Sequence, residues 1–156
     1  MRSGRRAAID VGKARVGIAA SDFHGILASG VATISRVDDL SETLNQVAAA
    51  LGEVAPIEIY VGLPLNLRGD FTESTKDAVA FAKGLSKVLS TPIRFIDERM
   101  TSNTAANALK LSGRDAKSGR AVIDQIAATV ILEQALSTER SNGSIPGQAI
   151  EDLNEA

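Results

Sequence analysis

The order of the apolar segments is the feature that most constrains the fold of this chain. Three strand-like runs come first, within residues 5–34, and only short turns separate them. After them, segments with helical spacing alternate with single strand-like runs. Hairpins followed by helical crossovers build a mixed sheet with helices on its faces. The sequence therefore predicts an α/β fold around a mixed, five-stranded sheet.

The expected strands are short runs of β-branched and small residues. They span residues 5–11, 16–20, 26–34, 57–61 and 93–96. The expected helices have apolar residues three and four positions apart. They span about residues 38–53, 73–89, 101–111 and 119–137. This many elements fits one domain with its own core.

Charge divides the chain near residue 138. Residues 139–156 hold one base, Arg140, against four acids, and they include the loop-like run 141–147. The preceding residues hold sixteen bases and fifteen acids. We therefore predict a single domain over residues 1–138 and a flexible acidic tail over 139–156.

Composition argues against several classes of protein. No apolar run approaches the roughly 20 residues that span a bilayer, and the start of the chain lacks the apolar core of a signal peptide. The chain has no cysteine and one histidine, His24, which argues against thiolate sites and the usual zinc sites. We expect a cytoplasmic protein with no membrane contact.

Carboxylates stand at three places where a charge is costly. Asp10 ends an apolar run, Asp97 and Glu98 end another, and Asp124 lies inside an apolar helix. A charge in such surroundings must be paired, hydrogen-bonded, neutralised or bound to a metal. If the three places converge, they form a site for a hard cation and a candidate centre for phosphoryl transfer.

Each of these acids also has a structural interpretation. Asp10 can cap its own hairpin turn, and the Asp97–Glu98 pair can be a solvated strand end. Because strand side chains alternate between faces, only one of that pair can readily join Asp10. Asp124 can form an ion pair with Arg120, four residues earlier on the same helix. The residues alone leave these alternatives open.

Basic residues gather in the segments that carry the acids. The first twenty residues contain five bases against one acid, and residues 94–120 contain six against three. A nucleic-acid partner is therefore compatible with the overall net charge of -2. Aromatic residues make up only 3% of the chain, which argues against a stacking platform for bases. Recognition should depend on phosphates and on the shape of the nucleic acid.

Together these motifs resemble one family. The resemblance covers about residues 5–136, and it rests on Asp10-Val11-Gly12, Arg15-Val16-Gly17 with Ala19, Val61-Gly62-Leu63-Pro64 with Gly69, Asp97-Glu98-Arg99 with Thr101, and Val122-Ile123-Asp124-Gln125 with Ala127-Ala128. The chain is similar to the YqgF/RuvX family of Holliday junction resolvases or pre-16S rRNA nucleases. That family belongs to the ribonuclease H-like superfamily, so the resemblance implies a ribonuclease H-like fold.

The resemblance also implies a site and a reaction. Asp10, Glu98 and Asp124 would bind one or two Mg²⁺ or Mn²⁺ ions and catalyse phosphodiester hydrolysis, with structured RNA or branched DNA as the partner. The implied substrate-binding residues are Lys13, Arg15, Arg68, Arg99, Arg114, Lys117 and Arg120. The chain departs from the family in two places. Ala14 stands where a lysine is common, and the basic run before Asp124 is diluted.

Four functions are compatible with this resemblance. The favoured one is an endonuclease that matures the 5′ end of pre-16S rRNA during ribosome biogenesis. The second is a Holliday junction resolvase, which makes two symmetric cuts and so would act as a homodimer. The third is a non-catalytic nucleic-acid-binding factor in ribosome assembly, which the diluted basic run motivates. The fourth is a small phosphohydrolase that acts on free nucleotides.

Overall fold

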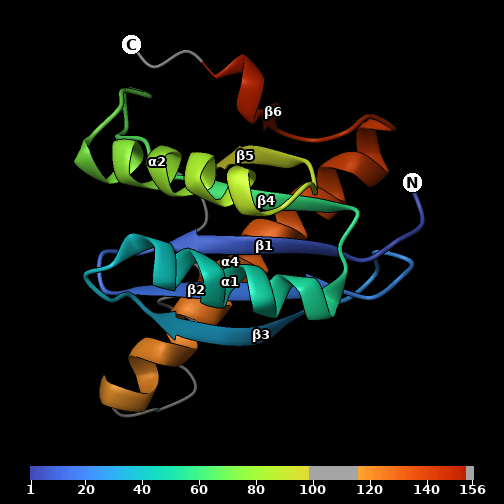
Figure 1. The fold of residues 1–156 in the computed structure, drawn as a ribbon. Coiled ribbons are helices and arrows are strands. Elements are labelled where there is room, and N and C mark those ends of the chain that lie inside the picture. The colour runs from blue at the N-terminus through green and yellow to red at the C-terminus, as the bar shows by residue number, and fades with distance from the viewer. Residues whose placement is uncertain (99–115, 154–156) are drawn as a thin grey trace.

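The computed structural model describes residues 1–98 and 116–153, and gives residues 116–121 as helical backbone only. Its sheet has six strands in the spatial order β3-β2-β1-β4-β5-β6 (Figure 1). The strands are β1 (Arg6–Val11), β2 (Arg15–Ser21), β3 (Ala28–Ser35), β4 (Glu58–Leu63), β5 (Ile93–Asp97) and β6 (Gln148–Ala149). All five predicted strands are present.

The sheet is mixed, as the sequence predicted. β1, β2 and β3 pair antiparallel as two successive hairpins, and β1, β4 and β5 run parallel. β6 pairs antiparallel with β5 and makes six strands where five were expected. Since β1, β4 and β5 are parallel, their carboxyl ends meet at one edge of the sheet. That edge receives both Asp10 and the Asp97–Glu98 pair.

Three helices cover the two faces of the sheet. α1 (Leu40–Val54) and α2 (Glu73–Val88) lie on one face, while α4 (Ala116–Asn142) crosses the other (Figure 1). α1 begins after Asp39, whose side chain accepts a hydrogen bond from the Ser41 backbone N–H. The predicted helix over residues 101–111 lies outside the described residues. None of the described helices is both long and apolar enough to cross a lipid bilayer.

α2 begins after Thr72, which is its N-cap residue. The hydroxyls of Thr72 and Thr75 each accept a hydrogen bond from the other residue's backbone N–H, which forms a capping box. The two threonines therefore satisfy two backbone N–H groups at the start of the helix.

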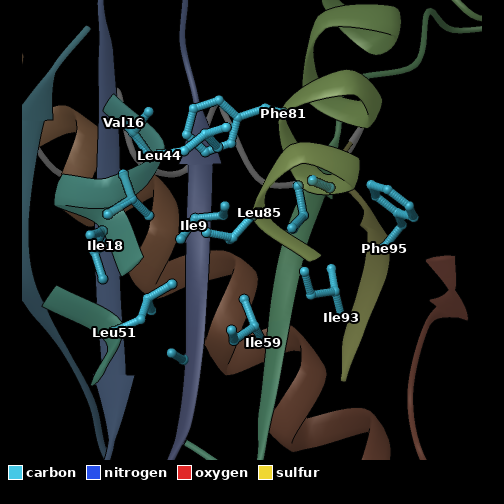
Figure 2. Close-up of a cluster of buried hydrophobic side chains, with 14 of the residues drawn as sticks. Ile9, Val16, Ile18, Leu44, Leu51, Ile59, Phe81, Leu85, Ile93 and Phe95 are labelled. Atoms are coloured by element: carbon cyan, nitrogen blue, oxygen red, sulfur yellow. The ribbon is translucent and has the colours of Figure 1, made fainter. Parts of the chain in front are cut away.

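Two apolar cores lie on either side of the sheet. The larger core packs between the sheet and α1 and α2, around residues such as Ile9, Leu51 and Phe81 (Figure 2). The smaller core packs beneath α4 and includes Ala8 and Ile131. Neighbouring residues of β1 thus enter opposite cores, as strand alternation requires. β1 is apolar on both sides because both faces are covered.

The predicted boundary at residue 138 is not a structural boundary. α4 continues to Asn142, and the chain then returns to pair β6 with β5. Arg94 holds this return through the carbonyls of Pro146 and Gly147, at 2.6 and 2.7 Å. The return also carries Ile150 and Leu153 onto the larger core. Residues 139–153 therefore belong to the domain, and 154–156 lie outside the described residues.

A buried ionic network fixes the far half of α4, and sequence reasoning missed it. Arg6 is fully buried, and its Nη2 donates to Glu139 Oε2 at 2.7 Å. The Arg2 backbone N–H also donates to Glu139, at 2.9 Å, and the Arg2 guanidinium reaches Glu58 at 2.8 Å. Although burial opposes ionisation, the contacts from Arg2 and Arg6 lower the pKa of Glu139 to about 2. The network ties α4 to β1, β4 and the N-terminal residues.

Candidate active site

The carboxyl end of β1 places Asp10 on the face that α4 covers. Ala8, two residues earlier on β1, packs in the core beneath α4. Since strand residues two apart share a face, Asp10 points to the same side. α4 crosses this face, and its residue Asp124 lies against Gly17 of β2.

Two glycines make room for the acids that approach Asp10. Gly17 lies opposite Asp10 in the β1–β2 ladder, and a Cβ at Gly17 would overlap the backbone carbonyl of Asp124. On the other side, Ile9 pairs with Val61, so the register sets Gly62 beside Asp10. A Cβ at Gly62 would overlap the Glu98 carboxylate. Gly17 and Gly62 thus form a floor, here called the glycine floor, on which the acids rest.

Sequence reasoning did not find the full role of this floor. In the sequence, Gly17 and Gly62 stand out only as parts of the motifs that carry the family resemblance. The available signal was a glycine inside each strand, which often marks a close approach by another group. In this fold the approaching groups are the Asp124 backbone and the Glu98 side chain.

Strand alternation separates Glu98 from Asp97. Phe95 enters the core beneath α1 and α2, and Ile96 enters the core beneath α4. Asp97 therefore shares the side of Phe95, while Glu98 shares the side of Ile96 and Asp10. The Glu98 backbone N–H donates to the Leu63 carbonyl at 3.3 Å, which keeps the chain extended past the end of β5. Of the adjacent pair, it is Glu98 that lies with Asp10.

The electrostatics show that the acids interact. Burial, together with the negative charge of Asp124, raises the pKa of Asp10 to about 6. Burial, together with repulsion from Asp10 and Asp97, raises the pKa of Glu98 to about 7. The Asp10 carboxylate has no hydrogen bond or ion pair with the residues that the structure describes.

Among the side chains that the structure describes, one cation contacts an acid of the cluster. Arg15, the first residue of β2, donates from Nε to Asp124 Oδ2 at 2.6 Å. Sequence reasoning suggested Arg120 as the partner of Asp124, because the two are one helical turn apart. The side chain of Arg120 lies outside the described residues, and the Arg15 contact spans 109 positions. Asp124 is therefore held from the neighbouring strand.

The donor set suits a hard divalent cation. Oxygen ligands are those that Mg²⁺ and Mn²⁺ prefer, and a cation would relieve the repulsion that raises the pKa of Asp10 and Glu98. As the side chains stand, no group of three His, Asp or Glu residues within 1–98 and 116–153 is arranged to share one ion. The carboxylates are chemically suited to Mg²⁺ or Mn²⁺, and their side chains would have to rotate to share one ion.

The predicted substrate-binding residues fall into three sets. Arg15 contacts the acids, Lys13 is exposed in the β1–β2 turn, and Arg68 is exposed in the loop after β4. Arg99 and Arg114 lie outside the described residues. Lys117 and Arg120 are placed on α4 only by their backbone. The structure therefore brings Arg15 alone of these seven into contact with a carboxylate of the cluster, among the side chains that it describes.

A separate cleft of about 500 Å³ lies near Lys13 and the N-termini of α1 and α2. It is lined by Lys13, Arg36, Val37, Asp38, Glu73, Ser74 and Asp77. Arg36 already pairs with Asp77 at 2.7 Å, and the lining carries three acids against two bases. This charge does not favour a phosphate, so the cluster around Asp10 is the better candidate for chemistry.

Solved structures of Thermus thermophilus RuvC share this fold. The structure of Thermus thermophilus RuvC aligns with a TM-score of 0.55 and 15% identity, over 93% of this chain and 99% of that chain. The same protein in complex with a Holliday junction substrate aligns with a TM-score of 0.57 and 16% identity, over the same shares. At this identity the likeness shows the fold, which is ribonuclease H-like, as the sequence predicted.

Relatives at higher identity span nearly the whole chain. A protein of Leifsonia xyli is 46% identical over 97% of both chains, and one of Streptomyces avermitilis is 44% identical over 97% of both. Each bears the name "Putative pre-16S rRNA nuclease". Residues 4–138 also match the family described as RuvX: Holliday junction resolvase. The chain therefore belongs to the RuvX family of nucleases.

Proposed function

We propose that this protein is an endonuclease that depends on a divalent metal and hydrolyses phosphodiester bonds in structured nucleic acid. Its proposed reaction is the maturation of the 5′ end of pre-16S rRNA in the cytoplasm. The observation that carries the proposal is the gathering of Asp10, Glu98 and Asp124 on the glycine floor. Buried carboxylates that repel one another on a rigid sheet edge are costly to stability, which points to a functional reason for their presence.

The proposed roles follow from position. Asp10 lies between Glu98 and Asp124, so it can share a cation with either of them. Mg²⁺ or Mn²⁺ bound by these carboxylates would activate a water for attack on phosphorus and stabilise the leaving oxygen. Parallel strands and the buried glycine floor restrict the motion of the acids, which favours an ordered site.

The choice of RNA rests on the relatives. Those at 44–46% identity are named for pre-16S rRNA, and the match covers almost their full length. The scarcity of aromatic residues agrees with a substrate recognised by phosphates and shape. The exposed bases Lys13 and Arg68 are proposed to contact the phosphate backbone at the rim of the site.

The test is cleavage of a transcript that carries the 5′ precursor segment of 16S rRNA, with Mg²⁺ and with EDTA. We expect cleavage by the wild type in Mg²⁺ only. Glu98→Gln and Asp10→Asn should lose activity by at least about 100-fold while they still bind the transcript. Asp97→Asn is the matched control, because Asp97 lies next to Glu98 but on the other face, and its activity should stay within a few-fold of wild type.

Two outcomes would contradict the proposal. Equal loss in Asp97→Asn and Glu98→Gln would mean that the placement of Glu98 does not determine the chemistry. Absence of cleavage by wild type on both RNA and branched DNA, with binding retained, would favour the non-catalytic assembly factor. Turnover of free nucleotides without cleavage of polymer would favour the small phosphohydrolase.

Junction resolution is the second candidate. The family description and the fold shared with RuvC favour it. It requires two copies of the site, because a junction is resolved by two symmetric cuts. A synthetic four-way DNA junction, assayed beside the rRNA transcript and with sedimentation of the protein–junction complex, separates the two. Symmetric nicks by a dimer would support the resolvase, and cleavage confined to the rRNA transcript would support the first candidate.

A further inference from the structure

The ion pair between Arg15 and Asp124 joins two parts of the site that the proposed function uses separately. The Nε to Oδ2 distance is 2.6 Å, and the exposed fractions of the two side chains are 32% and 13%. Arg15 was expected to bind substrate phosphate and Asp124 to bind metal. In the fold, the two side chains instead bind each other.

The two ends of this ion pair differ in how freely they can move. The Asp124 backbone lies directly over Gly17, so α4 cannot shift toward the sheet at this point. The Arg15 backbone is also fixed, because its carbonyl accepts a hydrogen bond from the Gly12 N–H at 2.9 Å. The Arg15 side chain is long and one-third exposed, so it is the part that can leave the pair.

A guanidinium on Asp124 opposes a second cation in two ways. It occupies Oδ2, and its positive charge weakens the attraction that a divalent ion would meet among the acids. The reverse also holds, because an ion bound to Asp124 would repel the guanidinium. Arg15 and the ion therefore compete for one carboxylate.

We propose that Arg15 is the counter-cation of Asp124 while no metal is bound, and that metal binding releases it toward the substrate phosphate. This inference rests on the proposed function. Arg15 is then a positioning residue for Asp124 in one state and a phosphate ligand in the other. The planar guanidinium suits both tasks, since carboxylate and phosphate oxygens accept its N–H groups in the same geometry.

This exchange of Arg15 for a metal ion on Asp124 predicts that loss of Arg15 has opposite effects on the affinities for Mn²⁺ and for nucleic acid. Without Arg15, Mn²⁺ has no competitor on Asp124 and should bind more tightly. Nucleic acid should bind more weakly to the metal-loaded protein, because one phosphate contact is lost. A residue that only supports the fold would lower both affinities, and a residue that only binds phosphate would leave the affinity for Mn²⁺ unchanged.

The experiment compares wild type, Arg15→Gln and Arg15→Lys by calorimetric titration with Mn²⁺. We expect Arg15→Gln to raise the Mn²⁺ affinity roughly tenfold, as loss of a half-buried competing ion pair implies, and Arg15→Lys to show a smaller change. Arg36→Gln is the matched control, since it removes the same charge near the same hairpin. Arg36 pairs with Asp77 and not with an acid of the cluster. Its Mn²⁺ affinity should match wild type.

Binding of the rRNA transcript is measured on the same proteins with Ca²⁺ in place of Mg²⁺. Arg15→Gln should bind the transcript more weakly. The dependence of its binding constant on salt concentration should fall by the amount that about one phosphate contact contributes. A direct readout is the NMR signal of the Arg15 Nε–H in wild type. It should be protected from solvent exchange in EDTA and should lose that protection when Mg²⁺ is added.

Several results would overturn the exchange. A Mn²⁺ affinity in Arg15→Gln equal to or below that of wild type would do so, and cleavage by wild type would then leave the proposed function standing. If Arg15→Gln fails to fold, an Arg15 Nε–H signal in wild type that does not respond to Mg²⁺ would be decisive. Failure of wild type to bind Mn²⁺ at all would reject both the exchange and the metal-dependent function.

Discussion

Replacing Asp10 by asparagine should make the metal-free protein more stable at alkaline pH. Asp10 is desolvated by burial and repelled by Asp124, which raises its pKa from an ordinary 3.8 to about 6. Because the unfolded chain loses this proton first, the folded state loses stability as the pH rises from about 4 through about 6. Asparagine has nearly the same shape and carries no charge, so Asp10→Asn escapes this loss.

The size of the gain follows from the two pKa values. Their difference corresponds to about 3 kcal/mol when both states are fully ionised. Partial solvent access reduces the expected gain to about 2 kcal/mol at pH 8. For a chain of this length, that raises the melting temperature by about 4–8 °C. At pH 4 the variant and the wild type should differ little, since Asp10 then keeps its proton in the folded state.

The assay is thermal unfolding in EDTA at pH 4, 6 and 8, followed by circular dichroism. Asp124→Asn is the contrasting variant, because it breaks the ion pair with Arg15 and should lower the free energy of unfolding by about 1 kcal/mol at pH 8. A melting temperature of Asp10→Asn at pH 8 at or below that of wild type would refute the electrostatic reasoning. So would a gain that does not shrink as the pH falls.

Three further predictions concern the glycine floor, proton release and the chain terminus. Gly62→Ala should lower the free energy of unfolding by about 1–3 kcal/mol, because its Cβ would overlap the Glu98 carboxylate. Gly52→Ala, in α1 with no atom near its Cβ, should instead raise it by about 0.5–1 kcal/mol in urea titrations. Mn²⁺ affinity should fall as the pH drops below about 7, because the Glu98 proton must leave, and calorimetry in buffers of different ionisation enthalpy should detect the released proton. Truncation after residue 147 removes β6 together with Ile150 and Leu153, and should lower stability to urea by about 2 kcal/mol; an unchanged midpoint would contradict their packing on the core.

Local patterns were sufficient to predict most of the fold. The strands that form β1 to β5 carry strand-like apolar runs, and α1 and α2 carry helical spacing, so each element is visible in its own residues. β6 has only two residues and no pattern, and it exists because the chain after α4 returns to the open edge of β5. Its pairing depends on tertiary structure, which explains why residues 139–153 were assigned to a tail.

The acids of the site were visible in the sequence, but their partners were not. Asp10, the Asp97–Glu98 pair and Asp124 stood out because each ends or interrupts an apolar run, and the family resemblance selected Glu98 from the pair. Alternation could favour Glu98 over Asp97 only after the fold showed which face Asp10 occupies. The sequence suggested Arg120 as a partner of Asp124, because the two residues are one helical turn apart. The partner that the structure describes, Arg15, lies on a strand that only the folded sheet brings near.

The burial of Glu139 implies a gradient of motion along α4. About 22 Å of helix separates Glu139 from Asp124, and the buried ionic network holds only the Glu139 end. Amide hydrogens near Glu139 should exchange with solvent only when the whole domain unfolds. Those near Asp124 can exchange through local opening of the helix end, at lower free energy. The part of α4 that carries Asp124 can therefore open locally while the fold as a whole persists.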